Sequence, residues 1–157
     1  MSSIKEQTQE KLASLFADHS TATPLPFVEE SDYSICGYYL NIVVSPDLLI
    51  ETVTVLDELG YFLESITGVD WPKEEEIESV YDFNRYDEHS FRIVIRTRTS
   101  RDTPVIPSIT SVYNGANWHE RETRDFFGID FTGHPHLIPL LLPEDADFHP
   151  LLKDFKA

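Results

Sequence analysis

The sequence predicts an α+β fold, a two-layer sandwich in which helices cover a mixed, largely antiparallel sheet. Two observations lead to this prediction. Helix start and stop signals flank three stretches with helical spacing of apolar residues, and several short runs between them are rich in β-branched and aromatic residues. A Pro-rich segment then follows the last helix. We therefore expect one domain over residues 1–130 and an extended tail over residues 131–157.

The first part of the chain is expected to form a helix, a strand and a second helix. Residues 3–18 place apolar side chains at partly helical spacing. Residues 38–44 are aromatic and β-branched, which is typical of a strand. Ser45 with a following proline is a helix start, and Gly60 is expected to end that helix.

The middle of the chain is expected to form antiparallel strands, because apolar and polar residues partly alternate there. The segment 67–72 is interpreted as a turn because of Gly68 and Pro72, and the acidic run 74–76 is interpreted as a solvated loop. The expected strands cover residues 61–66, 78–83 and 91–96, with a hairpin loop over 86–90 between the last two.

The last helix is the most densely charged part of the chain. Asn117 is expected to cap it, and Glu120 three residues later would complete a capping box. Gly128 is expected to end the helix. Opposite charges four residues apart predict two ion pairs on the helix surface, Glu120–Arg124 and Arg121–Asp125.

Composition excludes several classes of function. The 157 residues include 12 basic and 28 acidic ones, a net charge of −16 that disfavours nucleic acids and anionic membranes as partners. No apolar run is long enough to cross a bilayer, so we expect a soluble chain without direct membrane insertion. The single cysteine, Cys36, cannot by itself hold an iron–sulfur cluster or a structural zinc.

No motif indicates a reaction carried out by this chain alone. Three histidines, His134, His136 and His149, could serve a metal-dependent hydrolase, but the first two sit on a bend without a rigid element. Neighbouring carboxylates such as Glu144 and Asp145, or Glu120 and Glu122, identify nothing in so acidic a chain. Nucleophile elbows and phosphate-binding loops are absent from the sequence. We expect no catalytic, cofactor-binding or metal-binding residue here.

The charged helix and the tail together form a recognisable order of motifs. Glu120-Arg121-Glu122 runs into Asp125-Phe126-Phe127-Gly128-Ile129, and the later motifs are Gly133-His134-Pro135, Pro143-Glu144-Asp145 and His149-Pro150-Leu151-Leu152-Lys153-Asp154-Phe155. This order resembles the family of the thirty-kilodalton subunit of respiratory complex I, the NADH–quinone oxidoreductase. The resemblance covers roughly residues 61–155.

The resemblance implies a subunit without a redox centre, in the hydrophilic arm on the cytoplasmic side of a membrane complex. Such a subunit docks on the large subunit that shapes the quinone cavity, beside iron–sulfur subunits, in a hetero-oligomer. Iron–sulfur clusters and quinone are then expected in the partners, in a respiratory chain that couples electron transport to proton translocation.

Two departures from the family pattern keep an alternative open. Leu137-Ile138-Pro139 stands where a basic pair is usual, and Leu152 stands where an arginine is usual. Relatives occur in energy-converting membrane-bound hydrogenases, whose large subunit holds a nickel–iron centre, and the departures favour that type. A free-standing scaffold outside any redox complex is a third hypothesis.

We expect Arg121 and Glu122 to be partly buried and paired, either within the domain or across the partner interface. The centre of the partner interface is expected to be apolar, with Phe131, Leu140, Leu141, Leu142, Phe148, Leu151 and Leu152 as candidates. The residues expected to carry the family signature and the partner interface are Trp118, Glu120, Arg121, Glu122, Asp125, Phe126, Gly128, Phe131, Gly133, His134, Pro135, Leu141, Pro143, Glu144, Asp145, His149, Pro150, Lys153 and Asp154.

Overall fold

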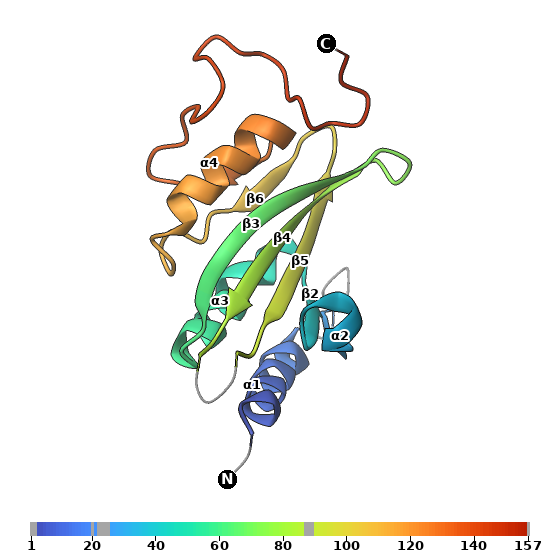
Figure 1. Cartoon of the computed structure of the whole chain (residues 1–157), viewed down its shortest axis with the longest axis vertical. Coiled ribbons are helices and arrows are strands. Elements are labelled where there is room, and N and C mark those ends of the chain that lie inside the picture. The colour runs from blue at the N-terminus through green and yellow to red at the C-terminus, as the bar shows by residue number, and fades with distance from the viewer. Residues whose placement is uncertain (1–2, 20, 22–25, 87–89, 157) are drawn as a thin grey trace.

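The computed structural model describes residues 3–19, 21, 26–86 and 90–156 (Figure 1). Its centre is a five-stranded sheet in the order β1-β2-β5-β4-β3, in which β2 and β5 run parallel and the other neighbours antiparallel. The α+β class and the mixed, largely antiparallel sheet are thus confirmed. The five strands are β1 (Phe27–Glu30), β2 (Leu40–Val43), β3 (Phe62–Trp71), β4 (Glu76–Asn84) and β5 (Ile93–Ser100).

Helices α1 (Ile4–Asp18), α3 (Leu49–Glu58) and α4 (Ala116–Phe127) bury apolar side chains against the sheet. Alternate residues of each strand face this core, because successive side chains of a strand point to opposite faces. The core includes Leu40 and Ile42 of β2, Ile77, Tyr81 and Phe83 of β4, Ile93 and Ile95 of β5, and Leu49, Val53 and Leu56 of α3.

The helices in the N-terminal half begin at residues that commonly cap helices, although not every such side chain makes a capping hydrogen bond. Ser3 and Glu6 form a capping box at the start of α1. The Ser45-Pro46 signal starts a 3₁₀ turn, Pro46–Leu48, which leads into α3, but the Ser45 side chain makes no capping hydrogen bond. The chain leaves α3 through Gly60, whose φ of +78° suits glycine.

The expected turn at Gly68 is wrong, because β3 continues through Gly68 to Trp71. A Cβ atom at position 68 would lie 2.4 Å from the Phe127 ring of α4, so the glycine lets the last helix pack closely on the strand. The chain turns instead at residues 72–75, where Glu75 has a φ of +56°. Residue 76 of the expected loop already belongs to β4.

The other expected hairpin is confirmed at its ends, since Tyr86 bridges Ser90, while residues 87–89 lie outside the described part. Sequence reasoning missed β1, the short helix α2 (Tyr33–Cys36) and a small parallel pair of strands. That pair joins β6 (Val105–Pro107) to β7 (Asp130–Thr132).

Phe131 lies in β7 and is only 1% exposed, so it belongs to the core of this chain. Its place in the core contradicts its expected role at the centre of a partner interface. The folded domain therefore includes residues 130–132, and the tail without strands or helices begins at residue 133.

None of the helices in the described ranges is both long enough and apolar enough to span a bilayer.

Candidate functional site

The tail after β7 lies along α4, and the polar side chains of α4 hold it there (Figure 1). Asp125 makes the central contact. Its Oδ2 atom accepts hydrogen bonds from three successive backbone N–H groups, those of Leu140, Leu141 and Leu142, at 2.9, 2.7 and 3.1 Å. Burial raises the pKa of this carboxyl, but the three N–H groups outweigh burial and hold the pKa below its ordinary value. Asp125 is thus an ionised anchor for the middle of the tail.

Arg121 holds the segment just before that anchor. Its guanidinium donates from Nε to the carbonyl oxygen of Ile138 and from Nη2 to that of Pro139, both at 3.0 Å. It also lies 5.2 Å from the centre of the Trp118 ring. Arg121 is 9% exposed, as expected, but its partners are backbone carbonyls of the tail.

The pairs expected along α4 therefore do not form in the described structure. Arg121 and Asp125 turn to opposite ends of the same tail segment, and Glu120 turns into the core. Glu122 is exposed in this chain, so the expected burial and pairing within the domain are wrong for this residue, and pairing across a partner interface stays a prediction. A buried polar group must find a hydrogen-bond partner, because it has lost its contacts with water. This requirement outweighs an exposed i,i+4 ion pair, which contributes only about 0.3–0.5 kcal/mol.

The C-terminal end of α4 contacts the second half of the tail. Gly128 ends the helix, as expected, with a φ of +80°. A Cβ atom there would lie 2.7 Å from the His149 ring, so only glycine allows the ring to come so near. Nδ1 of His149 lies 2.9 Å from the carbonyl oxygen of Asp125, and the N–H of Leu151 donates to that of Phe126.

A second anchor holds the last residues of the tail. Asp70, 2% exposed at the end of β3, accepts two hydrogen bonds from Arg101 at 2.7 and 3.1 Å and one from the N–H of Lys153 at 2.8 Å. Arg101 also pairs with Asp154 at 2.6 Å. The Arg101 guanidinium is the main reason that the pKa of Asp70 lies below its ordinary value. Lys153 extends its ammonium group over the Trp71 ring.

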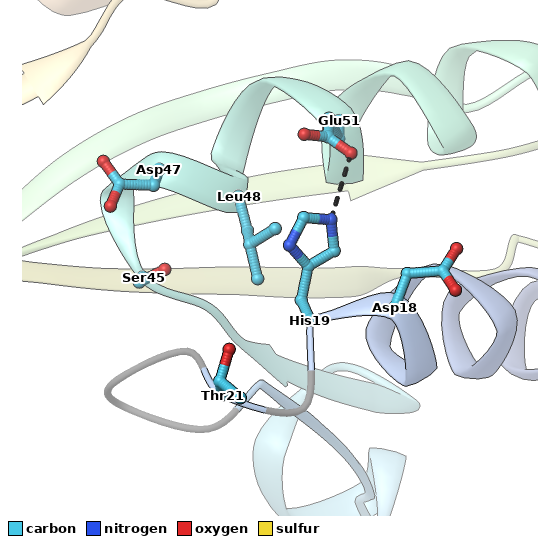
Figure 2. Close-up of a pocket in the computed structure, with 7 residues that line it drawn as sticks. All are labelled: Asp18, His19, Thr21, Ser45, Asp47, Leu48 and Glu51. Carbon is cyan, nitrogen blue, oxygen red and sulfur yellow. Dashed lines mark ion pairs between the residues drawn. The ribbon is translucent and has the colours of Figure 1, made fainter.

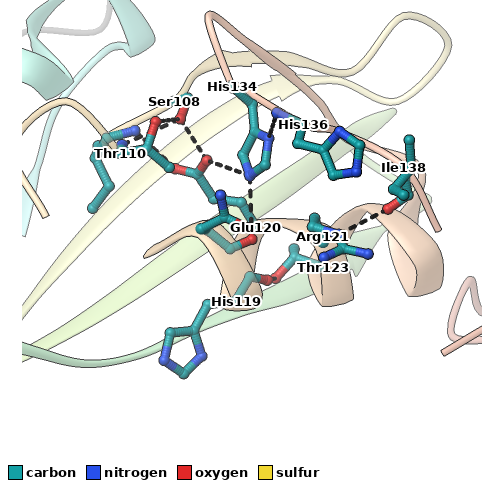
Figure 3. A network of polar contacts seen from close by, with 11 residues as sticks. Ser108, Thr110, His119, Glu120, Arg121, Thr123, His134, His136 and Ile138 are labelled. Atoms are coloured by element: carbon teal, nitrogen blue, oxygen red, sulfur yellow. Dashed lines mark hydrogen bonds and ion pairs between the residues drawn. The ribbon is translucent and has the colours of Figure 1, made fainter. Parts of the chain in front are cut away.

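Glu120 lies beneath the start of the tail and is fully buried (Figure 3). Its carboxylate accepts hydrogen bonds from the Ser108 hydroxyl at 2.6 Å and the Ile109 N–H at 2.8 Å, in the segment after β6. The expected capping box is therefore wrong: α4 begins at Ala116, and Asn117 lies inside it. Burial raises the pKa of Glu120 to about 7, against the opposing effect of its two donors.

The imidazole of His134, at the start of the tail, covers this carboxylate (Figure 3). Its Nε2 atom lies 3.9 Å from Oε2 of Glu120, and both side chains are 0% exposed. Nε2 also lies 3.2 Å from the carbonyl oxygen of Asn117, while Nδ1 accepts the N–H of His136 at 3.0 Å. An Nδ1 that accepts a hydrogen bond leaves Nε2 as the protonated nitrogen of the neutral ring.

Helix α4 and the tail carry several large apolar side chains that remain partly exposed in the described part of the chain. Leu140, Leu142 and Leu152 are half-buried, and Leu152 packs on the core, so these three contribute less exposed surface than expected. The exposed set contains Trp118 at 61%, Leu141 at 60% and Leu151 at 53%, together with Ile138, Phe148 and Phe155.

The predicted site residues thus divide into two groups. One group faces the domain and fixes the tail, and the other is exposed: Trp118, Glu122, Gly133, Pro135, Leu141, Pro143, Glu144 and Asp145. Lys153 and Asp154 are exposed too, but they fix the tail through Asp70 and Arg101. Sequence reasoning missed Asp70, Arg101 and Ser108 as tail or helix anchors. Their partners lie far away along the chain, and no local spacing signals such contacts.

The metal-site hypothesis finds no support in the described residues, where no three His, Cys, Asp or Glu side chains gather closely enough to hold an ion. His134 and His149 are each within hydrogen-bond distance of a carbonyl oxygen of α4. A separate pocket of about 410 Å³ between the end of α1 and the start of α3 contains an exposed pair, His19 and Glu51, 3.4 Å apart (Figure 2). The lining includes the acidic side chains of Asp18, Asp47 and Glu51, and it shows no chemistry beyond that pair.

Comparisons with known proteins agree on one family. A model of the family described as "Respiratory-chain NADH dehydrogenase, 30 Kd subunit" matches residues 42–157. The C subunit of the F(420)H(2) dehydrogenase of Methanosarcina mazei is 46% identical over 94 residues, 59% of this chain and 59% of that protein. The C subunit of the NADH-quinone oxidoreductase of Roseiflexus castenholzii is 42% identical over 120 residues, 73% of this chain and 68% of that protein. This chain thus spans about three fifths to two thirds of the length of these relatives.

Two solved structures share the fold. A chain of the membrane-bound sulfane sulfur reductase, an archaeal respiratory membrane complex, superposes with a TM-score of 0.74 at 26% identity, over 94% of this chain and 85% of that one. The trypsin-resistant fragment of Nqo5 superposes with a TM-score of 0.64 at 26% identity, over 83% of this chain and 99% of the fragment.

Proposed function

Because the chain belongs to the family of the 30 Kd subunit of the respiratory-chain NADH dehydrogenase, we propose that it is an assembly subunit of a complex I-like oxidoreductase. In this proposal the chain carries no active site, and it docks on the large subunit that forms the quinone site. Iron–sulfur clusters and quinone belong to the partners, and the chain is a peripheral subunit on the cytoplasmic side of a membrane complex.

The observation that carries the docking proposal is the group of six exposed apolar residues on α4 and the tail. We call Trp118, Ile138, Leu141, Phe148, Leu151 and Phe155 the docking residues. Large apolar side chains gathered on a fixed surface are typical of interfaces between permanent subunits. The anchors at Asp70 and Asp125 support this reading, because a tail already held in shape loses little conformational freedom when it binds.

The charge of the chain indicates the chemistry of the partner surface. Exposed acids, among them Glu122, Glu144 and Asp145, accompany the docking residues in a chain of net charge −16. A complementary partner presents an apolar centre with Lys and Arg around it, because opposite charges at the rim speed encounter and suppress wrong partners.

A nickel–iron hydrogenase-type complex is the alternative. The specific observations behind it are Leu137-Ile138-Pro139, where quinone-type members usually have a basic pair, and Leu152, where they usually have an arginine. Similar proteins are named for different complexes, the F(420)H(2) dehydrogenase and the sulfane sulfur reductase among them. Membership of the family therefore leaves the electron donor and the electron acceptor of this complex open.

Native purification with a tagged chain tests both parts of the proposal. We expect Leu141→Asp and Leu151→Asp to reduce the co-purifying large subunit by about tenfold or more, as a charge in an apolar interface costs about 2 kcal/mol or more. Ile35→Asp is the matched control, since Ile35 on α2 is 81% exposed and lies away from the tail (Figure 1). Unchanged co-purification of the two tail variants would exclude this docking surface.

The same preparation distinguishes the two kinds of complex. Quinone reductase activity with bound iron–sulfur clusters in the co-purified partner supports the complex I-like assignment. A nickel–iron centre in the large subunit supports the hydrogenase type.

A further inference from the structure

The contact between Glu120 and His134 differs from the other tail anchors, because a fully buried carboxyl here faces an imidazole ring and no cationic side chain pairs with it. It joins α4 to the first residues of the tail, within a few residues of Ile138, a docking residue. The anchors further along use Asp125 and Asp70, whose carboxylates are held ionised by N–H and guanidinium donors.

We propose that Glu120 and His134 form a proton-dependent latch that helps Arg121 to hold residues 133–138 against α4, and that the latch is closed only while the pair carries a single proton. The inference rests on the proposed docking function for its biological meaning, since the latch controls part of the docking surface.

The charge count follows from the burial of both side chains. With one proton, the pair is neutral overall, as a carboxylic acid beside a neutral ring whose Nδ1 accepts the His136 N–H. With no proton, a carboxylate is left buried beside a neutral ring. With two protons, an imidazolium is left buried beside a neutral acid. A buried charge without a partner is costly, and lifting His134 away from α4 admits water to relieve that cost.

The hydrogen bonds of the ring add to the cost of the second proton. Nδ1 accepts the N–H of His136 at 3.0 Å, and a protonated Nδ1 becomes a donor and must give up this bond. The turn that carries the chain from Gly133 into the tail therefore loosens when the ring becomes an imidazolium.

The surrounding groups leave this charge count unchanged. Tyr81 of β4 interacts with Glu120 from the sheet, and burial raises the pKa of its phenol, so it stays neutral over the relevant range. Ser108 and Ile109 contribute a hydroxyl and an N–H. Arg121, next to Glu120 on α4, is directed to the carbonyl oxygens of Ile138 and Pro139. The pKa of about 7 for Glu120 is consistent with a transition near neutral pH.

Hydrogen exchange on the full isolated chain tests the latch without any partner. The exchange protection of residues 134–138, corrected for intrinsic rates, is measured between about pH 5 and pH 9 and compared with that of Leu140–Leu142. We expect a bell-shaped profile for residues 134–138, with opening that rises by up to about tenfold per pH unit on each side, the limit for one proton. A flat profile, or one shared with Leu140–Leu142, would overturn the proposal.

Two variants separate the limbs of the bell. Glu120→Gln removes the carboxylate and should abolish the alkaline limb, and His134→Gln should abolish the acid limb. Glu122→Gln, on the exposed side of α4, is the control and should keep both limbs. An unchanged alkaline limb in Glu120→Gln contradicts the latch.

If either variant fails to fold, NMR titration of the wild-type His134 ring nitrogens decides. A ring signal that senses the ionisation of a neighbouring carboxyl near pH 7 supports the latch, and a ring that shows no such step refutes it. These measurements need no complex, so the latch and the docking surface can fail independently.

Discussion

Replacement of Glu120 by glutamine should stabilise the isolated chain above neutral pH. Glu120 is fully buried, and its pKa rises from an ordinary 4.5 to about 7. A carboxyl whose pKa is higher in the folded state binds its proton more tightly there than in the unfolded chain. Its contribution to stability is therefore complete below about pH 4.5 and is lost as pH rises through about 7.

The size of the effect follows from the shift. A difference of about 2.5 pKa units corresponds to about 3 kcal/mol of unfolding free energy, at about 1.4 kcal/mol per unit. Glutamine retains an acceptor for the Ile109 N–H and offers an amide donor to the Ser108 oxygen, so it keeps the contacts without the charge. We expect Glu120→Gln to be more stable than the wild type at pH 8 by about 1–3 kcal/mol, with a flatter pH dependence between about pH 5 and 7.

Urea unfolding followed by tryptophan fluorescence, at a series of pH values, measures this directly. Glu122→Gln serves as the control, because Glu122 is exposed on the same helix. A loss of stability in Glu120→Gln at pH 8, with the same pH slope as the wild type, would show that the ionised carboxylate is stabilising and would refute the reasoning.

Three further predictions concern the tail anchors. Gly128→Ala should destabilise the chain by more than the ~1 kcal/mol of a strained left-handed residue, because its Cβ displaces His149, and should expose the Leu151 N–H to exchange. Gly133 also has a positive φ, +82°, but open space surrounds it, so Gly133→Ala should lose only the stability that the strained backbone costs. Equal losses of stability in the two variants would contradict the close approach of His149 to Gly128. Asp70→Asn should cost about 3 kcal/mol in urea unfolding, since Arg101 loses its buried partner, whereas Asp102→Asn at an exposed neighbour should have little effect. Asp125→Asn should lower the exchange protection of the Leu140–Leu142 N–H groups. In the wild type, this protection should be lost only in acid, as pH falls through the depressed pKa of Asp125. Full protection in the variant would show that the charge of Asp125 is unimportant.

Local patterns in the sequence determined most of the secondary structure. The apolar spacing of residues 3–18, the partial alternation along β4 and β5, and the glycine after α4 each act within a few residues, so their spacing was enough to locate these elements. The order of charged and Pro-rich motifs likewise indicated the family and the importance of the last helix and tail. Strands of three or four residues such as β6 and β7 are too short to show a period, and they were missed.

Only the tertiary structure decided what each charged residue of α4 contacts. Helical spacing shows that Arg121 and Asp125 share a face, but it cannot show that tail carbonyls and N–H groups lie nearer than the opposite charge. The same holds for Glu120, which meets Ser108 and His134, and for Asp70, which meets Lys153 from 83 residues away. Buried polar groups pair with whichever partners the fold brings within reach, and that choice depends on the path of the whole chain.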